Sequence, residues 1–154
     1  MLKVNQKVIY PAHGLSIVKK IDTKTVGGKS VQFYILDVVN SGMTILVPIS
    51  DTEQLGVREI ISKEKAIDIL TFLAFGGKKV ENNYTWNRRY REYLEKLQTG
   101  SIDEIAYVVV ALRALRLEKD LSFGERKMLN QAQSLLESEL VEALGREVYS
   151  EYTA

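Results

Sequence analysis

The hydrophobic pattern of the 154-residue chain changes its period near residue 60. Before that point, short segments rich in Val, Ile, Phe and Tyr alternate with turn residues, which is typical of β-strands. After it, apolar residues recur every three or four positions, as they do along one face of a helix. The change predicts an α+β chain in two domains, a sheet domain over 1–58 and an all-helical domain over 59–154.

The first domain is predicted to be a small antiparallel sheet. Its candidate strands cover residues 7–11, 15–22, 30–39 and 43–49. Gly27-Gly28 separates the second from the third, and glycine adopts the positive φ angles that tight hairpins require. Four or five short strands cannot build a large sandwich from so few residues, so we expect a strongly bent sheet or a small barrel.

The second domain is predicted to be a compact array of four helices or more. Ser62 can cap the first helix, and the second covers residues 83–99. Two capping boxes, Ser101–Glu104 and Ser122–Glu125, open the third and fourth. The expected inward residues are Ala66, Ile69, Leu70 and Leu73, then Ile105, Val108, Val109, Leu112 and Leu115, then Met128, Leu129, Ala132, Leu135, Leu136, Leu140 and Leu144. The acidic end, 137–154, is expected to be a solvated face and a fraying helix end.

Composition and motifs argue against catalysis. The chain has no cysteine, and its single histidine, His13, stands in a turn, so thiolate chemistry is excluded and a metal site is disfavoured. It carries no phosphate-binding glycine loop and no nucleophile motif. We therefore expect a non-enzymatic protein with no cofactor and no metal. No apolar run approaches the ~18 residues that span a bilayer, and the start does not resemble a signal peptide, so we expect a cytoplasmic protein without membrane contact.

Positive charge is local, because the net charge is only +1. Residues 78–96 carry six Lys or Arg against three acidic residues, and this stretch includes the only tryptophan, Trp86. Arg88, Arg89 and Arg91 follow within one helical turn. Arginines beside a flat aromatic ring suit nucleic acid, since guanidinium groups hold phosphates and the ring can stack on a base or insert at a broken step.

A second interpretation of Trp86 stays open on the residues alone. Trp86, Tyr90, Leu94 and Leu97 are spaced by four, four and three positions, which predicts a buried helical stripe. Aromatic residues dominate protein cores, so this interpretation needs no ligand.

Three motifs together resemble one known family. "VNQKVIYPAHGLSIV" near the start, "TWNRRYREYLEKLQTGS" in the second predicted helix and "DLSFGERKML" before the fourth are similar to motifs of the CarD/CdnL family of bacterial transcription regulators. They stand in the family's order and spacing, and the resemblance extends over nearly the whole chain. It implies a Tudor-like first domain that interacts with RNA polymerase and a helical second domain that contacts promoter DNA.

The resemblance also implies roles for individual residues. The hairpin "TKTVGG" and the edge strand "MTILVPI" match segments that dock on the polymerase β subunit, which points to Lys24, Val26, Leu46 and Pro48. From the residues alone, Leu46 is equally a core strand residue and Pro48 an edge-strand proline. In the helical domain, Trp86 matches a tryptophan that wedges into the minor groove at the upstream fork of the melted bubble. Arg88, Arg89 and Arg91 match basic positions that grip the nearby backbone.

The function implied is stabilisation of the promoter open complex, without reading a specific sequence, by a monomer associated with the nucleoid through polymerase. One alternative is an adaptor that binds another protein through the Tudor-like domain while the helical domain is purely structural. That alternative predicts a buried Trp86. A free-standing nucleic-acid-binding protein is disfavoured, because such proteins need a broad basic face.

Overall fold

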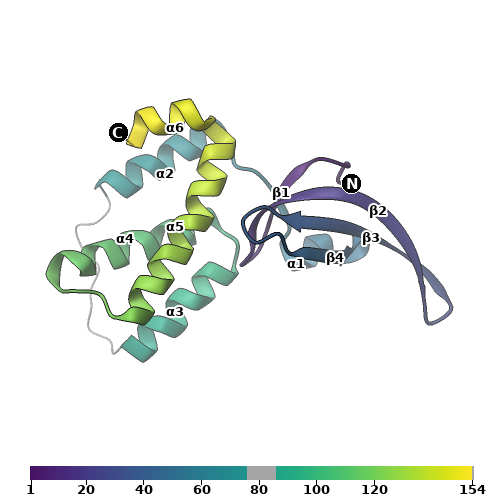
Figure 1. Cartoon of the computed structure of the whole chain (residues 1–154), viewed down its shortest axis with the longest axis horizontal. Coiled ribbons are helices and arrows are strands. Elements are labelled where there is room, and N and C mark those ends of the chain that lie inside the picture. The colour runs from purple at the N-terminus through teal and green to yellow at the C-terminus, as the bar shows by residue number, and fades with distance from the viewer. Residues whose placement is uncertain (76–85, 154) are drawn as a thin grey trace. The chain divides into compact units, whose positions relative to one another are not determined.

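The computed structural model describes residues 1–75 and 86–153, and the chain divides into two compact units, Met1–Ile60 and Ile61–Ala154. The first unit contains the sheet and the second contains the long helices (Figure 1). The predicted α+β class, with a bent antiparallel sheet followed by a helical domain, is confirmed. Along the described part of the chain, no helix combines the length and the apolar character needed to cross a membrane.

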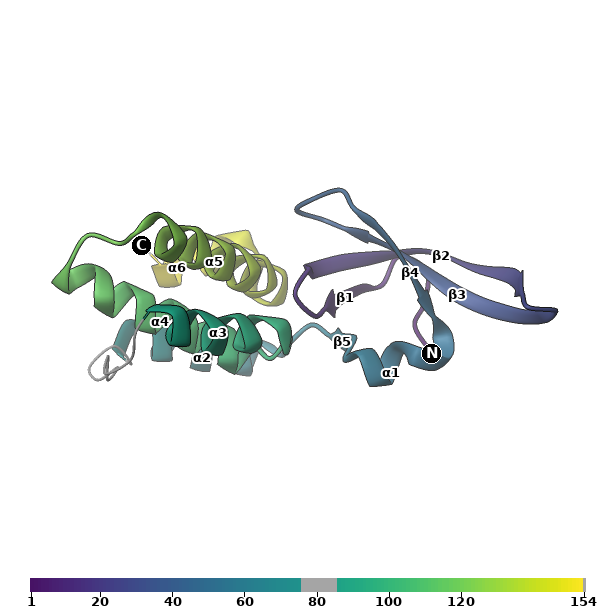
Figure 2. The same ribbon diagram turned by 90° about the horizontal axis from the view of Figure 1, so that it is seen from below.

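Among the described residues, the first unit forms one antiparallel sheet of five strands in the order β4-β3-β2-β1-β5. The strands are β1 (Lys7–Tyr10), β2 (Gly14–Val26), β3 (Lys29–Val38), β4 (Thr44–Pro48) and β5 (Arg58–Glu59). A 3-10 turn, η1 (Ile49–Asp51), and a short helix, α1 (Thr52–Leu55), connect β4 to β5. β2 and β3 form a long, curved two-stranded ribbon (Figure 2). This order leaves β4 at one edge of the sheet.

β2 is longer than predicted, because it runs to Val26 instead of ending at residue 22. The extension, residues 23–26, pairs with residues 29–32 at the start of β3. Gly27 and Gly28 close the hairpin with φ angles of 59° and 78°, as a tight turn with two positive φ values requires. All four residues of the extension are exposed, so they lack the apolar alternation that marks a half-buried strand in a sequence.

The core of the sheet domain lies on one face of the sheet. Val8, Val18, Tyr34, Leu36 and Val47 are almost completely buried there. The Tyr34 hydroxyl accepts a hydrogen bond of 2.9 Å from the backbone N–H of residue 2, so the buried ring keeps a partner for its polar end. A shift of register between Val18 and residue 20 marks a β-bulge, which increases the local bend of the ribbon.

Within the described residues, the second unit is built from five helices. They are α2 (Lys63–Phe75), α3 (Trp86–Gln98), α4 (Ile102–Glu118), α5 (Phe123–Leu144) and α6 (Arg146–Thr153). All the residues predicted to point inward from α2, α4 and α5 are buried or pack against the buried core. The Ser62 hydroxyl accepts a hydrogen bond of 3.1 Å from the Lys65 N–H, as expected of a capping residue. The sequence also predicts that Gly76-Gly77 ends the first of these helices, and both glycines lie outside the described residues.

α4 is the central helix of this domain and is apolar on more than the one face predicted. Besides the expected residues, Ala106, Val110 and Ala111 are buried. α2, α3 and α5 all pack against α4, so it has little surface left for solvent. A helix surrounded in this way must be apolar on most sides, so a prediction based on a single apolar stripe underestimates the number of its buried residues.

Of the two predicted capping boxes, the one at Ser122 forms and the one at Ser101 does not. At the start of α5, the Ser122 hydroxyl accepts from the Glu125 N–H at 3.2 Å and Glu125 Oε1 accepts from the Ser122 N–H at 2.8 Å, so that box forms. At the start of α4, Ser101 makes no capping hydrogen bond with its side chain. The Glu104 carboxylate binds Lys96 of α3 at 2.7 Å instead. The ion pair between helices therefore competes successfully with the local motif.

The predicted solvated face at the C-terminal end is confirmed, since residues 145–153 are exposed except for Tyr149, but the predicted fraying end is instead a further helix. α5 ends at Leu144, Gly145 takes a φ of 88°, and the chain continues as α6. Tyr149 of α6 packs against the helical core. Burial, followed by the nearby Glu137, raises the pKa of Tyr149 above its ordinary value, although Arg113 and Arg146 act in the opposite direction. The acidic composition of this segment hides one inward aromatic residue that holds the helix in place.

Candidate interaction surfaces

The residues singled out in the sheet domain share one face of the sheet. Lys24, Val26, Leu46 and Pro48 lie opposite residues 31, 29, 35 and 33 of β3, respectively. Residues opposite each other in neighbouring strands project to the same side, and alternate residues of one strand do so as well. All four therefore project from the face opposite the one that carries Tyr34 and Leu36.

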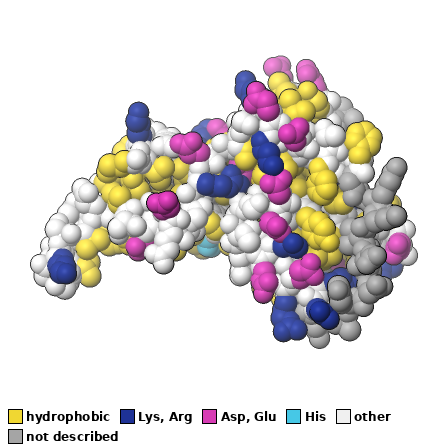
Figure 3. Space-filling model, turned by 180° about the vertical axis from the view of Figure 1, so that it is seen from behind, with side chains coloured by type: hydrophobic (Ala, Val, Ile, Leu, Met, Phe, Trp, Pro, Cys, Tyr) yellow, Lys and Arg dark blue, Asp and Glu magenta, His cyan; other side chains and the backbone are white. Residues whose placement is uncertain are grey.

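This outer face is apolar along its middle and basic at its margin. Val26 is 55% exposed and Leu46 is 43% exposed. Leu46 is therefore not a core strand residue, which the sequence alone had left possible. Phe33 and Ile35 lie between them on β3 and are half-buried, while Lys24 is exposed. Figure 3 shows hydrophobic side chains gathered on the surface of the sheet domain. An exposed apolar strip on a sheet is typical of a protein-binding surface.

The edge of β4 offers backbone groups beside the same face. The Val38 N–H donates to the Met43 carbonyl at 2.8 Å, so the alternate β4 residues 45 and 47 direct their backbone groups toward β3. Leu46 and Pro48 then direct theirs outward. Pro48 has no N–H, which limits how far a second strand can add to this edge.

In the helical domain, α3 begins at Trp86, but the Trp86 side chain lies outside the described residues. Two members of the predicted stripe are confirmed, because Leu97 is 1% exposed and Leu94 packs against the core. Tyr90 is wrong, because it is 42% exposed while Tyr93 is 3% exposed. The Tyr93 ring meets the Tyr107 ring of α4 edge-on, with 6.4 Å between centroids. The buried face of α3 thus passes through Tyr93, three residues beyond the tyrosine chosen from spacing.

The arginines of α3 fall into two groups. Arg88 and Arg91 are exposed, and Arg89 is half-buried. Burial and the nearby Tyr107 raise the pKa of Tyr93 to about 12, while Arg89 acts in the opposite direction, which places Arg89 close to the inward face. The helix carries four basic residues against two acidic ones, so an excess of positive charge remains on it.

The start of α5 carries basic residues that were not predicted from the sequence as a candidate site. Glu125, in the first turn of α5, lies near enough to Tyr93, in the middle of α3, to affect its pKa, so the start of α5 lies near α3. The next two residues, Arg126 and Lys127, are exposed and follow Glu125 directly. The basic pair inside "DLSFGERKML" was the signal that could have found them. Spacing alone could not show that the start of α5 lies near α3, a helix distant in sequence.

Glu125 is the buried centre of this junction. Its side chain is 1% exposed, and its Oε1 also accepts a hydrogen bond from the Lys119 ammonium at 3.1 Å. Burial acts to raise the pKa of Glu125, but hydrogen bonds from Ser122 and Lys119 outweigh it, so the pKa lies below its ordinary value. The carboxylate therefore stays charged and holds the start of α5 to the segment between α4 and α5.

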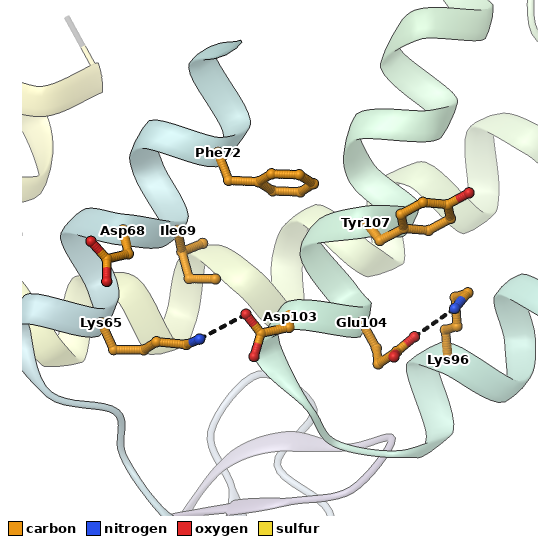
Figure 4. A pocket seen from close by; sticks show the side chains of 8 residues that line it. All are labelled: Lys65, Asp68, Ile69, Phe72, Lys96, Asp103, Glu104 and Tyr107. Carbon is orange, nitrogen blue, oxygen red and sulfur yellow. Dashed lines mark hydrogen bonds and ion pairs between the residues drawn. The ribbon is translucent and has the colours of Figure 1, made fainter. Parts of the chain in front are cut away.

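A pocket of about 340 Å³ lies among α2, α3 and α4. Two ion pairs line it, Lys65–Asp103 and Lys96–Glu104, each at 2.7 Å (Figure 4). The Lys96 ammonium also lies 4.9 Å from the centre of the Tyr107 ring. The hydrogen bond to Glu104 raises the pKa of Lys96, against the effect of burial. Lys96 is therefore paired with Glu104 in this pocket and is only partly exposed, unlike Arg88 and Arg91.

Comparison with known proteins assigns both domains. The family model described as "CarD-like/TRCF RID domain" matches residues 2–61, and the model described as "CarD, C-terminal domain" matches residues 68–150. The chain belongs to the CarD family. Within it, the chain is 30% identical over 140 residues to the Bacillus subtilis (strain 168) protein named "Putative transcription factor YdeB", covering 91% of this chain and 90% of that protein.

Membership in the CarD family gives the chain a role in transcription regulation. The first match contains the whole sheet with its outer face, and the second contains α3 and α5 with their basic residues. Both candidate surfaces therefore lie inside segments that the CarD family shares.

Proposed function

We propose that this protein is a non-enzymatic transcription regulator that binds the β subunit of bacterial RNA polymerase and stabilises the promoter open complex. The sheet domain attaches the protein to polymerase, and α3 contacts the upstream edge of the DNA bubble. The observation that carries the proposal is the placement of Lys24, Val26, Leu46 and Pro48 on one exposed face of a domain that matches the "CarD-like/TRCF RID domain" model.

On the polymerase side, the apolar strip supplies the affinity. Burying Val26 and Leu46 against a partner removes apolar surface from water, at about 25 cal/mol per Å². Lys24 at the margin favours an acidic partner surface and orients the encounter. The outward backbone groups of β4 add hydrogen bonds with the partner at the same edge.

On the DNA side, Arg88 and Arg91 hold phosphates, and Trp86 inserts where the base stack is already broken. A few phosphate contacts give weak, salt-sensitive binding that cannot find a promoter unaided. Attachment to polymerase raises the local concentration at one place on the DNA, so a weak contact is sufficient.

The stabilisation of the melted state follows from differential binding. A ring that inserts only at a distorted step binds the open complex and not the closed one, and a ligand shifts an equilibrium only by such a difference. A difference of about 1.4 kcal/mol changes the ratio of open to closed complexes tenfold.

The lifetime of polymerase–promoter open complexes tests this proposal directly. The wild-type protein, Trp86→Ala and the control Gln98→Ala, at an exposed position near the far end of α3, are compared after a competitor is added. Wild type and Gln98→Ala are expected to lengthen the lifetime, and folded Trp86→Ala is expected to lose most of the effect. Binding of wild type to polymerase with no change in lifetime would make the protein an adaptor. A large loss of stability in Trp86→Ala would make Trp86 a core residue.

A further inference from the structure

The chain between the two domains is fixed on both sides of a single residue. Glu59, the last residue of β5, lies opposite Val8 of β1 in the sheet. Ile61 is the first residue of the helical unit, and its side chain packs against the helical core. Ile60 stands between them.

A buried carboxylate holds the helical side of this connection. Glu139 of α5 is 2% exposed, and its Oε2 accepts a hydrogen bond of 3.0 Å from the backbone N–H of Ile61, 78 residues earlier in the chain. The next residue, Ser62, is fixed as well, because its hydroxyl caps α2 through the Lys65 N–H. The backbone is therefore held from Ile61 into the first turn of α2.

Packing alone does not account for a glutamate at this position. Burying a carboxylate costs free energy, and an apolar side chain of similar volume is often equally or more stable at a buried site. What the carboxylate provides is a charge-assisted hydrogen bond, which is stronger and more directional than a neutral one. The accepting oxygen, Oε2, binds the backbone at Ile61, where the chain enters the helical domain from the sheet domain.

We propose that Glu139 is a positioning residue that pins the start of the helical domain and leaves Ile60 as the only joint between the two domains. The pin restricts the motion of one domain against the other. Its functional consequence rests on the proposed function, since it links the polymerase-binding face to the DNA-contacting helix through a one-residue joint. A short connection keeps the effective concentration of the second contact high once the first has formed.

The rotational motion of the two domains, measured without polymerase, tests whether Glu139 restricts their relative motion. Backbone 15N relaxation of the full-length protein gives a rotational correlation time for the amides of each domain. In wild type and in the conservative Glu139→Gln, which keeps a carbonyl acceptor, the two domains are expected to share one value. In Glu139→Leu the two values are expected to separate, and the Ile61 amide is expected to exchange its hydrogen faster.

A linker variant separates the pin from the stability of the helical core. Insertion of Gly-Gly between Ile60 and Ile61 leaves Glu139 and the core unchanged but lengthens the joint from one residue to three. It is expected to separate the correlation times even if Glu139→Leu fails to fold. Independent tumbling in wild type, or a shared value in folded Glu139→Leu whose Ile61 amide exchanges as in wild type, would overturn the proposal.

Open-complex lifetime then measures the consequence for function. With the joint lengthened threefold, the effective concentration of the second contact falls roughly two- to fivefold, and the lifetime is expected to shorten by a similar factor. Altered tumbling with no change of lifetime would contradict the functional part alone. If the wild-type protein has no effect on the lifetime, the proposed function is contradicted. The role of Glu139 in holding Ile61 is then tested by the 15N relaxation measurement alone.

Discussion

The outer face of the sheet and the exposed side of α3 are built from opposite chemistry. The sheet face exposes Val26 and Leu46 along an apolar strip, whereas α3 exposes Arg88 and Arg91. Burial of apolar surface does not depend on salt at physiological concentrations, while contacts to phosphates weaken steeply as salt rises. The apolar face can therefore hold the protein to a partner over a range of salt, while the basic helix makes a weaker contact that depends on salt.

The largest effect is expected from a charge placed on the apolar face. Leu46→Glu puts a carboxylate where the polymerase is proposed to pack, and an unpaired buried charge costs several kcal/mol. Binding to polymerase is expected to weaken by about 30-fold or more, equivalent to ~2 kcal/mol. Calorimetric titration of polymerase with the variant measures it.

The control for Leu46→Glu adds the same charge to the other face of the ribbon. Gln32→Glu changes an exposed residue of β3 whose neighbours in the strand project to the face with Leu46. It is expected to bind like wild type. Equal weakening by both variants would show that net charge, and not the apolar face, determines binding.

The second effect concerns Glu125, the buried carboxylate that caps α5. The folded pKa of Glu125 lies below its unfolded value, so the folded state gains stability above the ordinary glutamate pKa of about 4.3 and loses it as pH falls through the folded pKa. Glu125→Gln is expected to flatten this acid loss and to lower the free energy of unfolding at pH 7 by about 1–2 kcal/mol, as loss of a cap does.

Urea unfolding between pH 7 and pH 3 measures the Glu125 effect. Glu147→Gln, at an exposed position of α6, is the matched control and is expected to follow wild type. A Glu125→Gln profile parallel to that of wild type across this range would contradict the assignment.

Features set by residues close together in the sequence were predicted correctly. Features set by a contact with a residue distant in the sequence were missed. The strands at 7–11, 30–39 and 43–49 were predicted from their Val, Ile, Phe and Tyr content between turn residues, and the predicted capping box at Ser122 forms. The box at Ser101 failed because Lys96, in another helix, takes Glu104. On α3, Tyr90 and Tyr93 both fit a helical stripe, and only contact with Tyr107 decides which is buried.

The third effect isolates one phosphate contact. Arg91→Met removes an exposed positive charge from α3 while keeping an apolar stem of similar shape. If Arg91 holds one phosphate, the slope of log affinity against log salt is expected to fall by about one unit. The measurement is binding of polymerase-attached protein to fork DNA over a range of salt. A smaller affinity with an unchanged slope would mean that Arg91 acts through shape and not through charge.

The smallest effect is expected from Lys96→Met, which removes an equal charge from the same helix. The Lys96 ammonium lies 2.7 Å from Glu104 and the side chain is only 25% exposed, so it is less available to a phosphate than the exposed Arg91. The salt slope of DNA binding is expected to stay at the wild-type value, and the loss of a partly exposed ion pair is expected to cost at most about 1 kcal/mol of stability. Arg91→Met and Lys96→Met each remove one positive charge from α3, so the two variants have the same net charge. They differ in whether the lost cation was exposed or paired with Glu104. Equal slopes in the two variants would show that α3 attracts DNA through its total charge. A change in Arg91→Met alone would show that the exposed side of the helix makes the contact, as the division between its buried and exposed residues requires.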